Sequence, residues 1–188
     1  MAIAGLYKIF DHWHKEGTLY IYSDPHFDDL DLAAGLSNRP SAEEQVKMIN
    51  SKVGRKDTIV FLGDIGNAEW VRKIRGYKIL IMGNHDAGRT NYETIFNEVF
   101  EGPVMLGEKL ILSHEPVDVP WAFNIHGHDH VGAKRKNHLN VCADVIGYTP
   151  VNMNQFMKSG ALAHIETIHR QTIDIADARK AKRGGRKK

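Results

Sequence analysis

Five short polar segments follow apolar, strand-like runs, and they contain residue types that bind metal ions. They supply carboxylates, imidazoles and one carboxamide, but no thiolate. The segments are Asp24-Pro25-His26, Gly63-Asp64, Gly83-Asn84-His85-Asp86, Ser113-His114 and Gly127-His128-Asp129-His130. Borderline divalent ions such as Mn²⁺, Fe²⁺, Ni²⁺ and Zn²⁺ accept mixed nitrogen and oxygen ligands. A structural zinc site is disfavoured because no thiolate joins the set.

The spacing within two segments lets each reach one ion from a single loop. In Asp24-x-His26 and His128-x-His130 the ligating residue types alternate, and alternate residues of an extended segment point the same way. Polar groups at the carboxyl ends of core strands face the crevice where open α/β sheets bind ligands. Taken alone, Asp24 or Asp64 would more simply form a turn or cap a helix. The joint occurrence of five segments favours a site.

The elements that must position these segments follow from periodicity and capping signals. Strands are expected at residues 18–22, 58–62, 77–82, 104–106, 109–112, 122–125 and 139–143. Helices are expected at residues 6–13, 41–53, 68–74, 91–99, 152–158 and 161–178, with an edge strand at 167–175 as the alternative. Ser41 and Glu44 form a predicted capping box, Asn91 is a predicted cap, and Asn38-Arg39-Pro40 lies in a predicted polar loop. A βαβαβ first half and a strand-rich second half predict two packed sheets with helices outside.

Length and composition fit a single soluble α/β domain. The chain has 188 residues, of which 42% are hydrophobic and 26% charged, and it can bury roughly two-thirds of its unfolded surface. The single Cys142 excludes an intramolecular disulfide and suits a reducing compartment. No apolar run approaches the ~20 residues that cross a bilayer. A cytoplasmic location without membrane contact is therefore expected.

The last ten residues differ in charge from the rest of the chain. Seven of the 25 basic residues, and no acidic residue, follow Ala178, so acidic residues outnumber basic ones in the remainder. We expect residues 1–178 to form one domain and residues 179–188 to form a disordered basic tail. A solvated end is the simpler interpretation. The alternative is a weak, salt-sensitive contact with nucleic acid or another polyanion.

In order and content, the five segments closely resemble the calcineurin-like metallophosphoesterase superfamily. Its pattern is Asp-x-His, Gly-Asp, Gly-Asn-His-Asp/Glu, a lone His and Gly-His-x-His. Two further segments resemble a subgroup of small bacterial and phage phosphoesterases, namely Asn38-Arg39-Pro40 and residues 140–151, which read Asn-Val-x-x-Asp-Val-x-x-Tyr-x-Pro-Val. The resemblance covers residues 18 to about 156. It implies a four-layer α-β-β-α sandwich of two mixed sheets flanked by helices, the metallo-dependent phosphatase fold.

The resemblance also implies a role for each segment. Two divalent ions would be bound, Mn²⁺ first among them, with Fe²⁺, Ni²⁺, Co²⁺ or Zn²⁺ as alternatives. The implied ligands are Asp24, His26 and His130 for one ion, Asp64 between both, and Asn84, His114 and His128 for the other. A hydroxide between the ions would attack a phosphoester, and His85 would protonate the leaving alkoxide. Asp86 and Asp129 would orient imidazoles behind the ligands, and His126 is not expected to be a ligand.

One departure from the superfamily bears on the substrate. Protein Ser/Thr phosphatases follow Gly-Asp with x-x-Asp-Arg-Gly, whereas Asn67 replaces that Asp here and the arginine is absent. A phosphoprotein phosphatase is therefore disfavoured, and a phosphodiesterase acting on a small or nucleotide-like substrate is predicted. Arg39 and Arg89 are candidate phosphate contacts. A nuclease, a phosphomonoesterase and a non-catalytic protein-binding scaffold are the alternatives.

Overall fold

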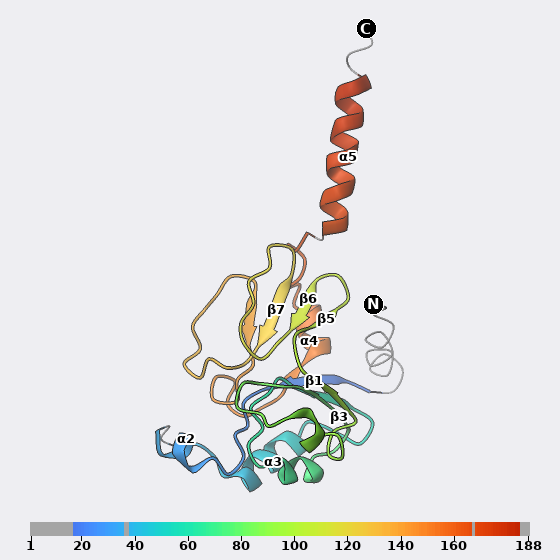
Figure 1. Cartoon of the computed structure of the whole chain (residues 1–188). Coiled ribbons are helices and arrows are strands. Elements are labelled where there is room, and N and C mark those ends of the chain that lie inside the picture. Colours follow the sequence, from blue (N-terminus) through green and yellow to red (C-terminus); the bar gives the residue numbers. More distant parts are fainter. Residues whose placement is uncertain (1–16, 36–37, 167, 185–188) are drawn as a thin grey trace.

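Two mixed β-sheets and several helices make up the α/β fold of the computed structural model, which describes residues 17–35, 38–166 and 168–184 (Figure 1). The first sheet has the order β4-β3-β2-β1-β9. Its strands are β1 (Leu19–Tyr22), β2 (Thr58–Phe61), β3 (Tyr77–Ile81), β4 (Glu98–Phe100) and β9 (Val151–Asn152). The second sheet has the order β5-β6-β7-β8. Its strands are β5 (Val104–Leu106), β6 (Leu110–Leu112), β7 (Phe123–His126) and β8 (His138–Asn140).

The two faces of the first sheet bury different partners. Because side chains alternate along a strand, Ile21, Val60 and Ile79 face one way and pack with the apolar residues of the second sheet. Ile59, Phe61 and Leu80 face the other way, towards α3 (Ala42–Asn50) and the 3₁₀ helix η1 (Ala68–Lys73). Loop residues cover part of the outer face of the second sheet, where Asn124 accepts a hydrogen bond from the Val117 amide at 2.8 Å.

Parallel pairing brings the carboxyl ends of the strands to a common edge. Strands β1, β2 and β3 pair in parallel, as do β6 and β7, and each of the five polar segments follows one of these strands. The two sheets also join here, because the Ser23 amide donates to the Val141 carbonyl at 3.1 Å and the His128 amide donates to Asp24 Oδ2 at 2.9 Å. The fold therefore collects residues from both sheets at one place.

Several predicted elements are confirmed. The seven predicted strands correspond to β1, β2, β3, β5, β6, β7 and β8. The Ser41–Glu44 capping box begins α3, and Asn152 caps α4 (Met153–Lys158). The helix predicted at 68–74 is the 3₁₀ helix η1. Two mixed sheets with helices agree with the expected α/β class; the four-layer arrangement remains a prediction. The helix expected at residues 6–13 lies outside the described residues.

Three expectations are wrong, and one further strand was missed. The helix predicted at 91–99 is a short 3₁₀ helix, η2 (Arg89–Asn91), followed by turns and β4, because Val99 pairs with Leu80 at the edge of the first sheet. The loop expected before Asn38 contains the short helix α2 (Leu30–Gly35). Strand β9 was not predicted. Helix α5 (Ile168–Gly184) excludes the edge strand considered at 167–175.

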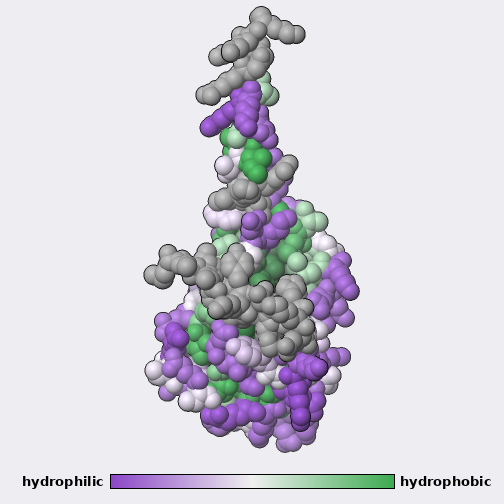
Figure 2. Space-filling view, turned by 90° about the vertical axis from the view of Figure 1, so that its right-hand side faces the viewer, coloured by the Kyte–Doolittle hydropathy of each residue, from purple (hydrophilic) through white to green (hydrophobic). Residues whose placement is uncertain are grey.

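Helix α5 also contradicts the predicted tail. It continues to Gly184, so residues 179–184 are helical rather than disordered, which agrees with the helix propensity of Ala, Arg and Lys. In Figures 1 and 2 this helix extends away from the two sheets, and its surface mixes hydrophilic with hydrophobic residues. Among the described residues no helix combines the length and apolarity needed to cross a membrane.

Candidate metal centre

One group of potential ligands joins the β1 end to the second sheet. Asp24, His26 and His130 each offer a ligand atom, and these atoms lie within 4.8 Å of one another. Asp24 Oδ1 is 4.0 Å from His26 Nε2 and 3.7 Å from His130 Nε2. Asp24 Oδ1 and His26 Nε2 are buried and have no hydrogen-bond partner among the described residues. Because buried polar atoms are normally paired, these orphaned atoms fit a cation that would bind them.

A second group lies beside the first. It consists of Asp64, His114 and His128, whose ligand atoms again lie within 4.8 Å of one another. The carboxamide oxygen of Asn84 joins it, 2.7 Å from His114 Nε2 and 3.1 Å from His128 Nδ1. The seven residues predicted to be metal ligands therefore lie together, although they come from five separate segments of the chain.

Asp64 lies between the two groups. Its Oδ2 atom is 3.5 Å from His26 Nε2 and 3.4 Å from His114 Nε2. Its other oxygen, Oδ1, accepts a hydrogen bond from the His85 amide at 2.9 Å. One carboxylate thus lies between both groups, and its role as a ligand shared by two ions, which the resemblance implies, stays a prediction.

The tautomers of three histidines are fixed in the form that binds a metal. The Nδ1 atom of His26 faces Asp29 Oδ2 at 3.1 Å, that of His114 faces the Leu62 carbonyl at 2.7 Å, and that of His130 faces Asp144 Oδ2 at 2.6 Å. Since these oxygens can only accept hydrogen bonds, each Nδ1 must donate. The Nε2 atoms then present their lone pairs to the two groups, an arrangement typical of metal-binding histidines.

Backbone strain is concentrated at the same residues. Asp24, His26, Asp64 and His128 have φ angles of 56°, 40°, 53° and 66°, in the left-handed region that L-residues seldom adopt. Such strain persists only where surrounding structure enforces it, and it clusters at functional sites.

Two glycines permit the close packing of these loops. A Cβ atom on Gly127 would lie 2.1 Å from Asp24 Oδ2, and one on Gly83 would lie 2.2 Å from Asp64 Oδ1. Neither position can accept a side chain without moving a ligand. This explains why glycine precedes both the His128 and the Asn84 segments.

The Asp144 carboxylate holds His130, and the sequence did not predict this contact. This carboxylate accepts hydrogen bonds from His130, the Tyr148 hydroxyl and Arg39 Nη1. Burial opposes its ionisation, but the bonds from His130 and Tyr148 and the charge of Arg39 hold the pKa of Asp144 well below its usual range. In return, the hydrogen bond to Asp144 raises the pKa of His130. The signal for this role was the Asn-Val-x-x-Asp pattern, which marked Asp144 without assigning it a function.

Arg39 is a structural residue rather than the predicted phosphate contact. Its side chain is 4% exposed. Nη1 lies 2.5 Å from Asp144 Oδ2, and Nη2 donates to the carbonyls of Asp24 and Pro25, each at 2.7 Å. The guanidinium therefore lies behind the ligands and links the β1 loop to Asp144. The other candidate, Arg89, is half exposed and pairs with Glu93 at 2.9 Å.

The two carboxylates predicted to orient imidazoles hold backbone instead. Asp86 accepts from the amides of Gly83 at 2.8 Å, Asp64 at 3.0 Å and Ile65 at 2.9 Å. Asp129 accepts from the amides of Val131 and Ala133, each at 3.0 Å. Both therefore fix the loops that carry ligands. Histidines are oriented by Asp29 and Asp144, which sequence reasoning missed.

His85 lies next to the first group and is exposed to solvent. Its ring centroid is 5.8 Å from that of His26. Among the described residues, no side chain forms a hydrogen bond or ion pair with the His85 ring. Asn67, at the position of the phosphatase aspartate, instead donates to Asp28 at 2.8 Å. His85 thus lies beside the first group with an exposed ring and without the charged partner found in the protein phosphatases.

The remaining nearby groups stay outside the two ligand sets. His126 is buried, with Nδ1 2.8 Å from the Gly127 carbonyl, and burial lowers its pKa. Cys142 is buried with Sγ 3.4 Å from His130 Nδ1, and burial raises the pKa of this thiol. Cys142 therefore packs as a neutral thiol behind His130.

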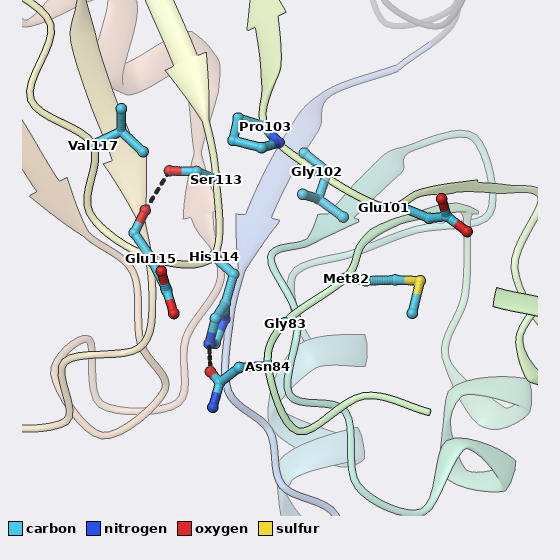
Figure 3. Close-up of a pocket in the computed structure, with 11 residues that line it drawn as sticks. Met82, Gly83, Asn84, Glu101, Gly102, Pro103, Ser113, His114, Glu115 and Val117 are labelled. Atoms are coloured by element: carbon cyan, nitrogen blue, oxygen red, sulfur yellow. Dashed lines mark hydrogen bonds between the residues drawn. The ribbon is translucent and has the colours of Figure 1, made fainter. Parts of the chain in front are cut away.

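A pocket of about 270 Å³ opens beside the second group (Figure 3). Asn84 and His114 form one part of its lining. Figure 3 shows the His114 ring directed towards the Asn84 carboxamide, with the Glu115 carboxylate on one side of this pair and Met82 and Glu101 on the other. The pocket is therefore open space directly beside two of the potential ligands.

One known protein resembles this chain in sequence, and a solved structure resembles it in fold. "Uncharacterized protein MJ1445" of Methanocaldococcus jannaschii is 32% identical over 168 residues, covering 74% of this chain and 89% of that protein. The crystal structure of the protein of unknown function AQ665 from Aquifex aeolicus has a TM-score of 0.61 and 21% identity, covering 75% of this chain and 98% of that one. The latter likeness concerns the fold alone. No family model matches the chain.

Proposed function

This chain belongs to the same protein family as MJ1445, and we propose that it is a dinuclear-metal-dependent phosphoester hydrolase. The proposed activity is that of a phosphodiesterase on a small or nucleotide-like substrate. We also propose that the chain is a member of the calcineurin-like superfamily and has the four-layer sandwich of that superfamily. The observation that carries it is the convergence of two ligand groups on the shared Asp64, with the buried atoms Asp24 Oδ1 and His26 Nε2 left without partners among the described residues.

The ligand chemistry supports two divalent ions, Mn²⁺ first among them. Asp24, His26 and His130 would hold one, and Asn84, His114 and His128 the other, with Asp64 between them. When bound, a pair of ions supplies an activated water and neutralises charge on phosphate oxygens. Burial lowers the pKa of His26 despite Asp64 and Asp24 nearby, which favours the neutral imidazole that binds a cation.

His85 supplies the proton that the reaction needs at the leaving oxygen. Its ring is exposed next to His26, while its amide is held by Asp64 Oδ1. The backbone is thereby fixed, and the free imidazole can donate to the alkoxide as the P–O bond breaks. Because Asn67 is bound to Asp28, no fixed anion holds the proton on the ring in the way that a paired aspartate would.

The test is a metal-dependent assay combined with metal analysis. We expect the Mn²⁺-loaded protein to hydrolyse bis-(p-nitrophenyl) phosphate, and His85→Ala to reduce kcat by ~10²–10⁴-fold, the range typical of a general acid. The metal content of His85→Ala should match that of the wild type. His164→Ala is a matched control, since His164 is exposed and bonded to Asn137.

The alternative of a non-catalytic scaffold makes a different prediction. A protein that binds metal at both groups but turns over no phosphoester with Mn²⁺, Ni²⁺, Co²⁺, Fe²⁺ or Zn²⁺ would contradict the enzymatic proposal. A panel of phosphomonoesters and phosphodiesters assayed under the same conditions would separate the monoesterase alternative from the diesterase.

A nuclease is the second candidate, and the basic end of α5 is the feature that favours it. Seven basic residues follow Ala178, and the helix extends away from the sheets (Figure 1). If this end contacts nucleic acid, deletion of residues 179–188 should weaken single-strand binding and flatten its salt dependence, because each lost phosphate contact removes ~0.7 from the slope. An unchanged slope would identify a solvated end.

A further inference from the structure

Two buried histidine nitrogens on the second sheet lack partners, outside the candidate metal centre. They are His126 Nε2 and His138 Nδ1, which form no hydrogen bond with any described residue. His126 is 1% exposed and the His138 side chain is 4% exposed, so bulk water does not solvate these atoms. The same property marks Asp24 Oδ1 and His26 Nε2 in the candidate metal centre. Because buried polar atoms are normally paired, the two nitrogens point to a ligand.

The pairing of β7 with β8 places both histidines on one face of the second sheet. His138 lies opposite Asn124, which is two residues before His126 on β7. Alternate residues of a strand share a face, and Ile125 points the other way, into the core between the sheets. The two imidazoles are therefore neighbours on the outer face, with ring centroids 5.3 Å apart.

The other nitrogen of each ring is already bonded. His126 Nδ1 lies 2.8 Å from the Gly127 carbonyl oxygen, and His138 Nε2 lies 2.9 Å from Asp118 Oδ1. Since both oxygens accept hydrogen bonds, these two nitrogens donate. In a neutral imidazole the remaining nitrogen then carries a lone pair. Metal-binding histidines typically have this arrangement, with the second nitrogen bonded to a carbonyl or a carboxylate.

The spacing of the two rings matches that of the histidine pairs in the candidate metal centre. Ring centroids there are 5.3 Å apart for His26 and His130, and 5.0 Å apart for His114 and His128. Two imidazoles bound to one zinc ion at the usual ~2.0–2.1 Å, with a tetrahedral angle between them, have centroids about 5 Å apart. The two rings on the outer face therefore have the spacing needed to share one ion.

The ligand chemistry of this pair differs from that of the candidate metal centre. It consists of two imidazoles without a carboxylate, whereas each group of the centre includes an aspartate. Imidazole suits Zn²⁺, while Mn²⁺ prefers oxygen ligands. Asp118 lies behind His138 as the carboxylate of a carboxylate–histidine–zinc arrangement, and its other oxygen is 3.9 Å from Arg135 Nη1. A pocket of about 370 Å³, lined by Asp118 and His138, is the source of water for the remaining coordination positions.

We propose that His126 and His138 form a zinc site separate from the candidate metal centre, and that the bound ion stabilises the loop that follows β7. That loop begins at Gly127, whose carbonyl is bonded to His126, and it carries the predicted ligands His128 and His130. An ion that fixes the His126 ring would therefore also fix the start of the loop. The role is structural and does not depend on phosphoester hydrolysis.

The first test is the zinc content of His138→Ala. Full-length metal-free protein is equilibrated with excess Zn²⁺, freed of unbound ion by gel filtration and analysed for metal. The wild type should retain one more zinc ion per chain than His138→Ala, whatever number the candidate metal centre holds. With Mn²⁺ the two proteins should retain equal amounts. His164→Ala is the matched control, because it removes an exposed imidazole bonded to neighbouring Asn137 and should retain as much zinc as the wild type.

The second test uses the wild type alone, so that it stands even if His138→Ala does not fold. Addition of Zn²⁺ should shift the ¹⁵N resonances of His126 Nε2 and His138 Nδ1, and the other nitrogen of each ring should keep its proton. Unshifted resonances, as expected if only a buried water lies between the rings, would overturn the zinc site. So would equal zinc contents of the wild type and a folded His138→Ala.

Thermal unfolding tests the role of the ion in stabilising the loop. Zn²⁺ should raise the Tm of the wild type more than that of His138→Ala, because the variant lacks one site that binds only in the folded state. Equal rises in Tm would overturn the stabilising role.

Discussion

The two groups of potential ligands in the candidate metal centre differ in the contacts that hold their side chains. In the first group, His26 and His130 are held by carboxylates, Asp29 and Asp144, and Arg39 ties Asp144 to the β1 loop. In the second group, His114 is held by a backbone carbonyl, that of Leu62. Asn84 and His128 in that group are exposed.

The histidines of the first group are thus supported by side chains, whereas His114 of the second group is supported by the backbone. Carboxylates behind a histidine raise its basicity and fix its orientation, so the first group should bind its ion more tightly. The second group, with a neutral carboxamide and an exposed imidazole, can adjust as a substrate phosphate approaches. We therefore expect the two ions to bind in sequence, with the first group filled first.

The largest effect should come from Arg39→Met. The Arg39 and Asp144 side chains are only 4% and 10% exposed, and removing one partner of a buried ion pair typically costs ~3–5 kcal/mol. Urea unfolding of the metal-free protein would measure this loss. Arg89→Met is the matched control, because the Arg89–Glu93 pair is half exposed and surface changes usually stay within ~0.5 kcal/mol. Similar losses for both variants would show that the Arg39 network does not stabilise the first group.

Asp144→Asn should weaken metal binding at the first group without affecting the second, which tests the difference between the groups more directly. The carboxamide of asparagine has the same size and shape but cannot supply charge to His130 Nδ1, so Mn²⁺ affinity at the first group should fall ~10–100-fold, the usual effect of such partners. Calorimetric titration of the metal-free protein should show one weakened binding step and one unchanged step. Equal weakening of both steps would contradict the separation of the two groups.

The sequence predicted which residues could form metal-binding groups because their signals are local. Each segment follows an apolar strand, and the parallel order of β1, β2 and β3 brings three of the ends together. The capping box of α3 was equally local, with Ser41 and Glu44 three residues apart. Patterns within one loop or one helical turn were therefore enough to predict the convergence of these side chains and the capping box.

The supporting contacts were not predictable in this way. Arg39 and Asp144 are 105 residues apart in sequence, and no periodicity indicates that a charged side chain will be buried against a partner so distant. For the same reason Arg39 was assigned to substrate and Asp86 to an imidazole. The error at residues 91–99 has a similar origin, because Val99 is fixed as a strand by its pairing with Leu80, which overrides local helical propensity.

The smallest effect is expected from Tyr148→Phe, which tests whether the Asp144–His130 bond is the important member of the network. The Tyr148 hydroxyl donates to Asp144 Oδ1, whereas His130 and Arg39 share Oδ2. Loss of one such hydrogen bond should cost about 1 kcal/mol of unfolding free energy, and phenylalanine keeps the ring that lies 5.7 Å from Arg39 Cζ. Mn²⁺ affinity at the first group should fall only a few-fold, less than in Asp144→Asn.

Tyr77→Phe, which removes a hydroxyl bonded to Glu98 at 2.8 Å, should cost similar stability without changing either metal-binding step. If Tyr148→Phe instead weakens the first step as much as Asp144→Asn does, the carboxylate must depend on all its donors together, and His130 would not be held by Oδ2 alone.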